Sequence, residues 1–135
     1  MKFISFKHNN EAKFGIQNNK LITDLTNKIS GAKTLKDLIA KKAISEAKTY
    51  AIENPGNISL DEIEYMALIP NPGKIICVGL NYSEHVKETN RTVEENPVIF
   101  HRFPESQTAH MQYIQRPIAS HSLDFEGEMA VIMGE

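Results

Sequence analysis

Apolar and polar residues alternate in short runs at the start of the chain, and this pattern predicts β-strands. We expect strands over residues 2–7, 14–17 and 20–24, because a half-buried strand turns alternate side chains toward a core and toward water. Asn18-Asn19 separates the last two runs. Since asparagine tolerates a positive φ, this pair predicts a tight hairpin turn.

Two helices are expected after these strands. Apolar residues at helical spacing begin at Leu35. Thr34, directly before them, is a candidate N-cap, because its hydroxyl can accept a hydrogen bond from a backbone N–H of the first turn. A second helix is expected from about 43 to 51, since the helix-breaking sequence Asn54-Pro55-Gly56 follows it.

The pattern changes at Pro70-Asn71-Pro72-Gly73, which predicts a domain boundary. Residues 1–69 then form a small α/β domain, and residues 70–135 form a second unit. The fold class predicted for the whole chain is α+β.

Further strands and one helix are expected in the second unit. The unbroken apolar run Ile75–Val78 predicts a buried strand, and a short helix is expected to start near Asn81 or Ser83. Pro97–Phe100 predicts a short strand, and Phe125–Met133 predicts the last and clearest one. This last strand needs a pairing partner, which has to come from an earlier segment or from another chain.

Composition and charge exclude several classes of protein. Of the 135 residues 41% are hydrophobic and 24% are charged, so the chain can form a packed core. The net charge of -2 and the absence of Lys/Arg runs argue against nucleic-acid and membrane partners. Cys77 is the only cysteine in the sequence, which excludes an intrachain disulfide. A reducing compartment fits this cysteine content, and we expect a cytoplasmic protein.

Two glutamates lead into the last predicted strand. Glu126 and Glu128 are two positions apart, so their side chains would point the same way in a strand. Like charges this close require a cation, a proton or a basic partner. Mg²⁺, Mn²⁺ and Ca²⁺ favour such oxygen ligands. The alternative is that both carboxylates face water on an exposed strand.

A histidine and a glutamate share one face of the short predicted helix. His85 and Glu88 are three residues apart, which makes them neighbours on a helix surface. A carboxylate beside an imidazole orients the ring and raises its pKa, which prepares the ring to take a proton from water. The alternative is an exposed polar helix with an incidental pair.

The other histidines and the cysteine show no site pattern. His101, His110 and His121 match no zinc-binding spacing and are expected to be surface or loop residues. Cys77 is expected to be a small buried apolar residue of its strand.

Several blocks of the second half, taken in order, resemble the fumarylacetoacetate hydrolase (FAH) superfamily. The blocks that show the resemblance are Pro72–Tyr82, Ser83–Glu88, Pro97–Phe100, Ser106, Arg116-Pro117 and Leu123–Gly134. Residues 1–69 resemble the small N-terminal domain that precedes the catalytic domain in bacterial members.

This resemblance implies a mixed β-roll catalytic domain that is a homodimer when complete. It implies a divalent metal (Mg²⁺, or else Mn²⁺ or Ca²⁺) held by three carboxylates, two of which would be Glu126 and Glu128. His85 would be the general base acting on water, and Glu88 would orient it. The implied reaction is hydrolysis of a C–C bond in a small 2-oxo acid of the acylpyruvate type, through a metal-bound enolate.

The resemblance also implies groups that this sequence does not contain. In the family the third carboxylate and a lysine follow the Glu-x-Glu strand, and no residue here matches them. We therefore expect a truncated catalytic domain, the front part of a longer enzyme, with weak metal binding by itself. Two alternatives stay open: a 2-oxo-dicarboxylate decarboxylase or isomerase of the same family, and a catalytically inactive fragment or binding module.

Overall fold

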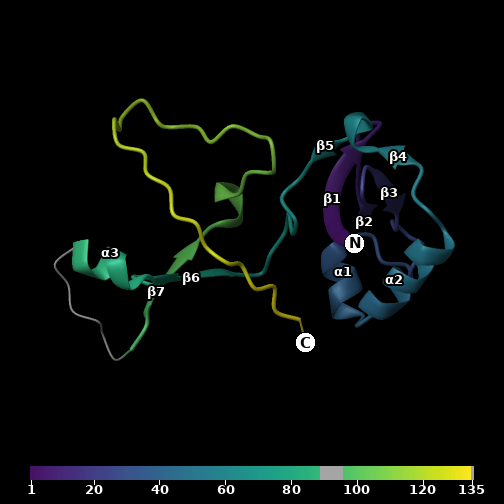
Figure 1. Cartoon of the computed structure of the whole chain (residues 1–135), viewed down its shortest axis with the longest axis horizontal. Coiled ribbons are helices and arrows are strands. Elements are labelled where there is room, and N and C mark those ends of the chain that lie inside the picture. The colour runs from purple at the N-terminus through teal and green to yellow at the C-terminus, as the bar shows by residue number, and fades with distance from the viewer. Residues whose placement is uncertain (89–95, 135) are drawn as a thin grey trace. The chain divides into compact units, whose positions relative to one another are not determined.

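The computed structural model describes residues 1–88 and 96–134, apart from the side chain of His85. These residues form two compact units (Figure 1). The first consists of Met1–Pro70 together with the chain from Thr108 onward, and the second is Asn71–Gln107. Each unit is described separately below.

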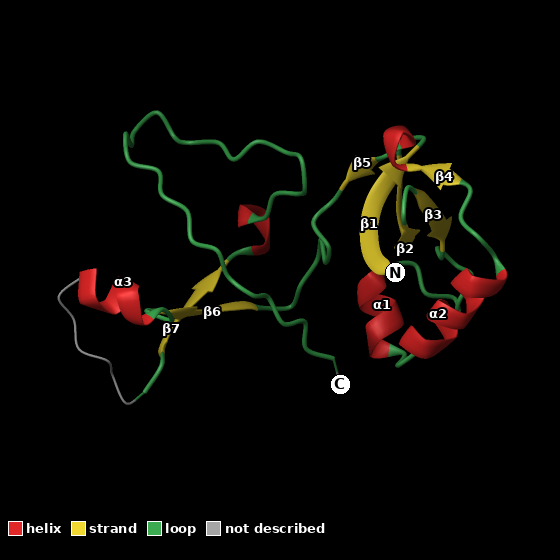
Figure 2. Cartoon of the chain, viewed as in Figure 1, coloured by secondary structure: helices red, strands yellow, loops and turns green. Residues whose placement is uncertain are grey.

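A five-stranded antiparallel sheet organises the first unit (Figure 2). The order across the sheet is β4-β3-β2-β1-β5. The strands are β1 (Lys2–His8), β2 (Glu11–Asn18), β3 (Leu21–Asp24), β4 (Ile58–Ser59) and β5 (Glu64–Tyr65). The three strands predicted in this part of the chain are therefore confirmed, and β4 and β5 add one short strand to each edge.

Asparagines with a positive φ lie in both tight turns of the sheet. The second turn consists of Asn19 and Lys20, one residue later than predicted, because Asn18 is the last residue of β2 and pairs with Leu21. Asn19 has a φ of 54°. The first turn was not predicted. Asn9 and Asn10 have φ values of 52° and 63° there and join β1 to β2. Strand β2 therefore begins at Glu11, three residues before the start of the predicted strand.

Two helices follow β3, at the positions that the sequence predicts. Helix α1 (Leu35–Ala40) has Thr34 as its N-cap, whose hydroxyl accepts a hydrogen bond from the Asp37 N–H at 3.1 Å. The Asp37 carboxylate in turn accepts one from the Thr34 N–H at 3.0 Å. Helix α2 (Ile44–Glu53) ends where Asn54-Pro55-Gly56 begins.

Hydrophobic clusters cover both faces of this sheet. The larger one packs the two helices and the loop before them against β2, and the smaller one lies among β1, β3 and β4. Polar bonds fix the surrounding loops: the Thr23 hydroxyl donates to the Asn54 carbonyl at 3.0 Å, and the Ser5 hydroxyl to the Leu68 carbonyl at 2.7 Å. At Gly15 a Cβ would lie 2.3 Å from the Thr23 carbonyl oxygen, so this strand position needs glycine.

A two-stranded ribbon and one short helix make up the second unit. Strands β6 (Ile75–Gly79) and β7 (Val98–Arg102) pair antiparallel, and helix α3 (Ser83–Glu88) follows β6. All three elements were predicted. The prediction that the first strand is buried is wrong: Ile76 is 63% exposed, because a two-stranded ribbon offers no second layer to cover it.

The strand predicted over Phe125–Met133 does not form, and this prediction is wrong for the described chain. Residues 123–134 have no regular secondary structure. Phe125 and Met129 are 88% and 90% exposed. A strand forms only when its backbone makes hydrogen bonds to a neighbouring strand. An alternating sequence pattern predicts two different faces, but it does not specify which segment is the neighbour.

Antiparallel strands together with short helices place the protein in the α+β class. The β-roll expected for the second unit stays a prediction. In the part of the chain that the structure describes, no helix has the length and apolar character needed to cross a bilayer.

Candidate functional site

The turn between β6 and α3 positions the first candidate pair. Leu80 takes a left-handed conformation with a φ of 56°, directly after the last residue of β6. The chain then enters α3, where the Val86 N–H donates to the Tyr82 carbonyl at 3.1 Å. Val86 is 4% exposed, so it anchors the helix.

Helix α3 holds His85 and Glu88 one turn apart. The side chain of His85 lies outside the described residues, so its contact with Glu88 stays a prediction from the helical spacing. Glu88 is exposed. On the same helix the Lys87 ammonium lies 3.5 Å from the Glu84 carboxylate, an exposed pair of the kind that adds little to stability.

The second candidate pair, Glu126 and Glu128, is exposed in the segment without regular structure. Just before it, the Asp124 carboxylate accepts a hydrogen bond from the Phe125 N–H at 2.8 Å. The prediction that both glutamate side chains point the same way assumed a β-strand. Because this segment is not a strand, the structure does not support that prediction.

These carboxylates have the donor chemistry that a hard divalent cation prefers. Among the residues that the structure describes, however, no group of three or more His, Cys, Asp or Glu side chains is placed to hold a metal ion. The two candidate pairs also belong to different compact units. Their assembly into one site with a metal is therefore a prediction of the sequence.

The other histidines show no shared site. The ring of His101, on β7, meets that of Phe103 edge-on at 5.5 Å, and His110 meets Tyr65 in the same way at 5.0 Å. Both histidines and His121 are exposed, as expected, although His101 lies on a strand. Cys77 is half-buried in β6 rather than buried.

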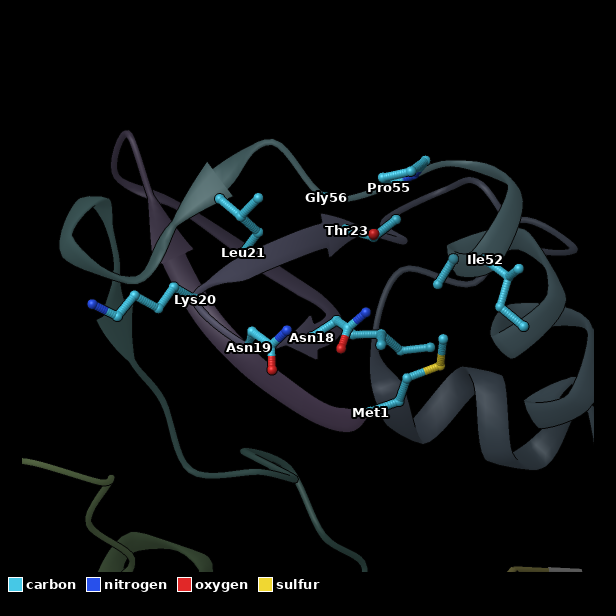
Figure 3. Close-up of a pocket in the computed structure, with 11 residues that line it drawn as sticks. Met1, Asn18, Asn19, Lys20, Leu21, Thr23, Ile52, Pro55 and Gly56 are labelled. Carbon is cyan, nitrogen blue, oxygen red and sulfur yellow. The ribbon is translucent and has the colours of Figure 1, made fainter.

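A cavity of about 540 Å³ in the first unit was not predicted (Figure 3). Figure 3 shows Met1, Leu21 and Ile52 around it; Met1 directly precedes β1, and the other two come from β3 and from α2. Asn18-Asn19 and Pro55-Gly56 also border the cavity. Both sequence segments are visible as breaks in the pattern, but their proximity is not, because it arises from the packing of distant parts of the chain, where the Thr23 hydroxyl donates to the Asn54 carbonyl.

The second half of the chain matches a known family. Residues 74–135 fit the sequence profile described as fumarylacetoacetate (FAA) hydrolase, C-terminal. The chain belongs to the fumarylacetoacetate hydrolase superfamily. All four candidate residues, on α3 and in the segment before residue 134, lie inside the matched range of this FAH profile.

Several FAH-superfamily relatives are similar to this chain. It is 35% identical to the mitochondrial oxaloacetate tautomerase fahd2 of Xenopus laevis over 97 residues, which are 72% of this chain and 30% of that protein. It is 40% identical to the mitochondrial oxaloacetate tautomerase Fahd2a of Rattus norvegicus over 78 residues, 58% of this chain and 25% of that protein.

An archaeal protein shows the highest identity of these three. An uncharacterized protein of Methanocaldococcus jannaschii is 44% identical over 64 residues, 47% of this chain and 27% of that protein. The chain thus matches between 25% and 30% of the length of these FAH-superfamily relatives.

Proposed function

We propose that the protein takes part in keto–enol tautomerisation of a small 2-oxo dicarboxylic acid, an isomerase reaction. The observation that supports this most directly is the 35% and 40% identity to two vertebrate proteins named oxaloacetate tautomerases. Tautomerisation is among the alternatives that the resemblance to the FAH superfamily left open. The relatives' names favour it over the C–C hydrolysis first expected.

The reaction moves one proton and breaks no carbon–carbon bond. A base takes a proton from the carbon next to the carbonyl, and a proton is added to the carbonyl oxygen. In this proposal His85 is that base, and Glu88, one helical turn further on, orients its ring. A positioned base of this kind contributes ~10²–10⁴-fold to a rate.

Glu126 and Glu128 are proposed as two ligands of a divalent cation, Mg²⁺ or Mn²⁺. Such a cation stabilises negative charge that develops on the oxygens of the substrate. Two carboxylates fill a small part of an octahedral shell, so water or other groups have to complete it. We therefore expect weak binding of Mg²⁺ to this chain by itself.

Replacement of His85 tests the proposal. In the presence of Mg²⁺ we expect His85→Ala to slow the enol-to-keto conversion of oxaloacetate at least ~100-fold, because the base is lost. The ultraviolet absorbance of the enol follows the reaction. Glu84→Gln on the same exposed helix is the matched control and is expected to keep the rate. An unchanged rate in His85→Ala would remove this residue from the mechanism.

A metal titration separates the role of the His85–Glu88 pair from that of the Glu126–Glu128 pair. We expect Glu126→Gln to weaken Mn²⁺ binding in a calorimetric titration and His85→Ala to leave it unchanged. Tight, stoichiometric Mn²⁺ binding that survives Glu126→Gln would contradict the proposed ligand role.

Hydrolysis of a C–C bond is the second candidate. It is favoured by the description of the family profile as a hydrolase and by the His85–Glu88 pair, whose chemistry also suits activation of water. Release of pyruvate from an acylpyruvate, with the enol of oxaloacetate converting at the uncatalysed rate, would establish the hydrolase instead. Failure of both assays would favour the inactive fragment or binding module.

A further inference from the structure

Apolar side chains gather around the cavity of the first unit. Ile16 and Ala51 line it and belong to the larger hydrophobic cluster. Met1, Leu21 and Ile52, which also line it, are 57%, 47% and 65% exposed. Three of the four large hydrophobic side chains that are exposed in the first 70 residues therefore border this cavity. Such a gathering on an otherwise well-packed surface marks a contact site.

Hydrogen bonds and one close backbone approach hold the walls of the cavity in place. The Gln17 side-chain amide donates to the Asn19 carbonyl at 3.0 Å, which fixes the turn between β2 and β3. The hydrogen bond from the Thr23 hydroxyl joins β3 to the end of α2. At Gly56 a Cβ would lie 2.4 Å from the Ile22 carbonyl carbon, so only glycine lets this loop run directly against β3. The cavity is therefore pre-formed, as small-molecule sites usually are.

The chemistry of the lining favours an uncharged ligand. Among the residues that the structure describes, Lys20 is the only charged side chain in the lining. Its ammonium group points away from the other lining side chains (Figure 3). Asn18 and Asn19 bring two side-chain amides to the cavity, and neither amide makes a hydrogen bond within the described part of the chain. An amide can donate or accept a hydrogen bond, whereas a charged ligand would lose hydration without gaining a charged partner.

We propose that this cavity is a binding site for a neutral, largely apolar small molecule that carries one hydrogen-bonding group. The apolar body lies against Met1, Leu21 and Ile52, and the amides of Asn18 and Asn19 receive the polar group. The volume of about 540 Å³ falls in the range of ~300–1,000 Å³ that is typical of small-molecule sites. Every lining residue precedes residue 74, where the match to the FAH profile begins. This binding function therefore goes beyond the proposed tautomerisation and uses none of its residues.

The dye N-phenyl-1-naphthylamine is a suitable probe, because it is neutral and aromatic, carries one N–H group and fluoresces more strongly in apolar surroundings. Its titration into the full 135-residue chain is expected to give a saturable rise in fluorescence. The second half of the chain also exposes apolar side chains, so NMR has to locate the bound probe. We expect the amide shifts to be concentrated in residues 18–23 and 51–56, which line the cavity.

Two matched substitutions test whether the probe occupies the cavity. Ile52→Glu is expected to weaken probe binding about tenfold, because it replaces an apolar contact by a carboxylate. Ile118→Glu makes the same change at a side chain that is 96% exposed outside the cavity, and it is expected to keep the affinity. Since both side chains are largely exposed, both variants are expected to keep the wild-type melting temperature.

A charged analogue of the probe tests the class of ligand. The dye 1-anilinonaphthalene-8-sulfonate has the same rings and amine but adds a sulfonate. We expect it to shift the amides of residues 18–23 and 51–56 only at higher concentration than the neutral dye, because no ammonium group points into the cavity. Equal or tighter binding of the sulfonate there would contradict the proposed neutral ligand.

Three further results would overturn the proposal. One is the absence of saturable binding, or amide shifts confined to residues 108–134. Another is an affinity that Ile52→Glu leaves unchanged, or that both variants lower equally. The third is a shift of the amides of residues 18–23 and 51–56 on dilution without probe, which would assign the cavity to a second copy of the chain. None of these measurements depends on tautomerase activity, so the proposed function is tested separately.

Discussion

Thr34 and Asp37 show how single residues determine the start of a helix in this protein. Each side chain binds the backbone N–H of the other, and the Asp37 carboxylate also accepts a hydrogen bond from the Lys33 N–H at 3.0 Å. Partial burial raises the pKa of Asp37, but the hydrogen bonds from Lys33 and Thr34 and the charge of Lys41 outweigh it. The pKa of this carboxyl is therefore lowered from its ordinary value of 3.8.

Replacing Asp37 by Asn is expected to lower the free energy of unfolding by about 1 kcal/mol at neutral pH, because the charged half of the capping box is lost. The lowered pKa sets the pH dependence: the stabilisation is present above the ordinary value of 3.8 and is lost as the pH falls through the folded value below it. Urea unfolding at several pH values measures this.

Glu53→Gln, at the exposed end of α2, is the control for the Asp37 variant. The difference between wild type and Asp37→Asn is expected to shrink at acid pH, whereas Glu53→Gln stays near wild type throughout. A constant difference from neutral to acid pH would argue against the role of the carboxylate charge.

At the scale of secondary-structure elements, the hairpin between β1 and β2 depends on its turn. Asn9 has a φ of 52°, and a β-branched residue is strained in this conformation. We expect Asn9→Val to lower the free energy of unfolding by ~1–2 kcal/mol. Lys2→Val, an exposed position on β1, introduces the same side chain without the positive φ and is expected to have little effect. Equal losses in both variants would contradict the turn argument.

The elements that the sequence predicted correctly are those determined by local chemistry. Thr34 and the breaker at Asn54-Pro55-Gly56 delimit helices through short-range bonds, and Asn19 adopts the turn that its side chain permits. The Asn9-Asn10 turn offered the same signal and was missed. Whether residues 125–133 form a strand could not be predicted from local chemistry. A strand requires a partner that is distant in the sequence, and the alternation of side chains does not specify that partner.

At the candidate site residues, the local backbone structure was predictable from the sequence to a similar degree, and their roles stay predictions. The structure places His85 and Glu88 on α3, where helical periodicity expects them. Glu126 and Glu128 do not lie in a strand, because residues 123–134 pair with no neighbouring strand in the described structure. The prediction that both side chains point the same way assumed such a strand. The cavity beside Met1 and Ile52 was missed, since turns that are distant in the sequence come together to form it.

At the scale of the whole molecule, exposed apolar residues are concentrated in the second half of the chain. Between Thr108 and Ser122, Tyr113 is 95% and Ile118 is 96% exposed. By contrast, Phe6 and Phe14, in β1 and β2, are 0% and 1% exposed. The sheet and helices of Met1–Pro70 therefore have a packed core, and the segment after Thr108 does not.

Brief digestion with chymotrypsin is expected to cleave first near Tyr113 or Phe125. The backbone there has no regular structure to protect it, whereas Phe6 and Phe14 are held in the sheet. Mass spectrometry of the early products identifies the cut. Initial cleavage at Phe6 or Phe14 would show that the packed core of the first unit is not stable.

The unequal distribution of the core has a genetic consequence. Except for Val86, every buried hydrophobic side chain in the described chain comes from residues 4–58. Mutations in this stretch act through stability, so they are expected to give temperature-sensitive alleles that recover function in the cold. Mutations among the described residues of 74–88 and 96–134 touch few buried groups. Their defects are expected to persist at every growth temperature and to leave the melting temperature of the protein unchanged.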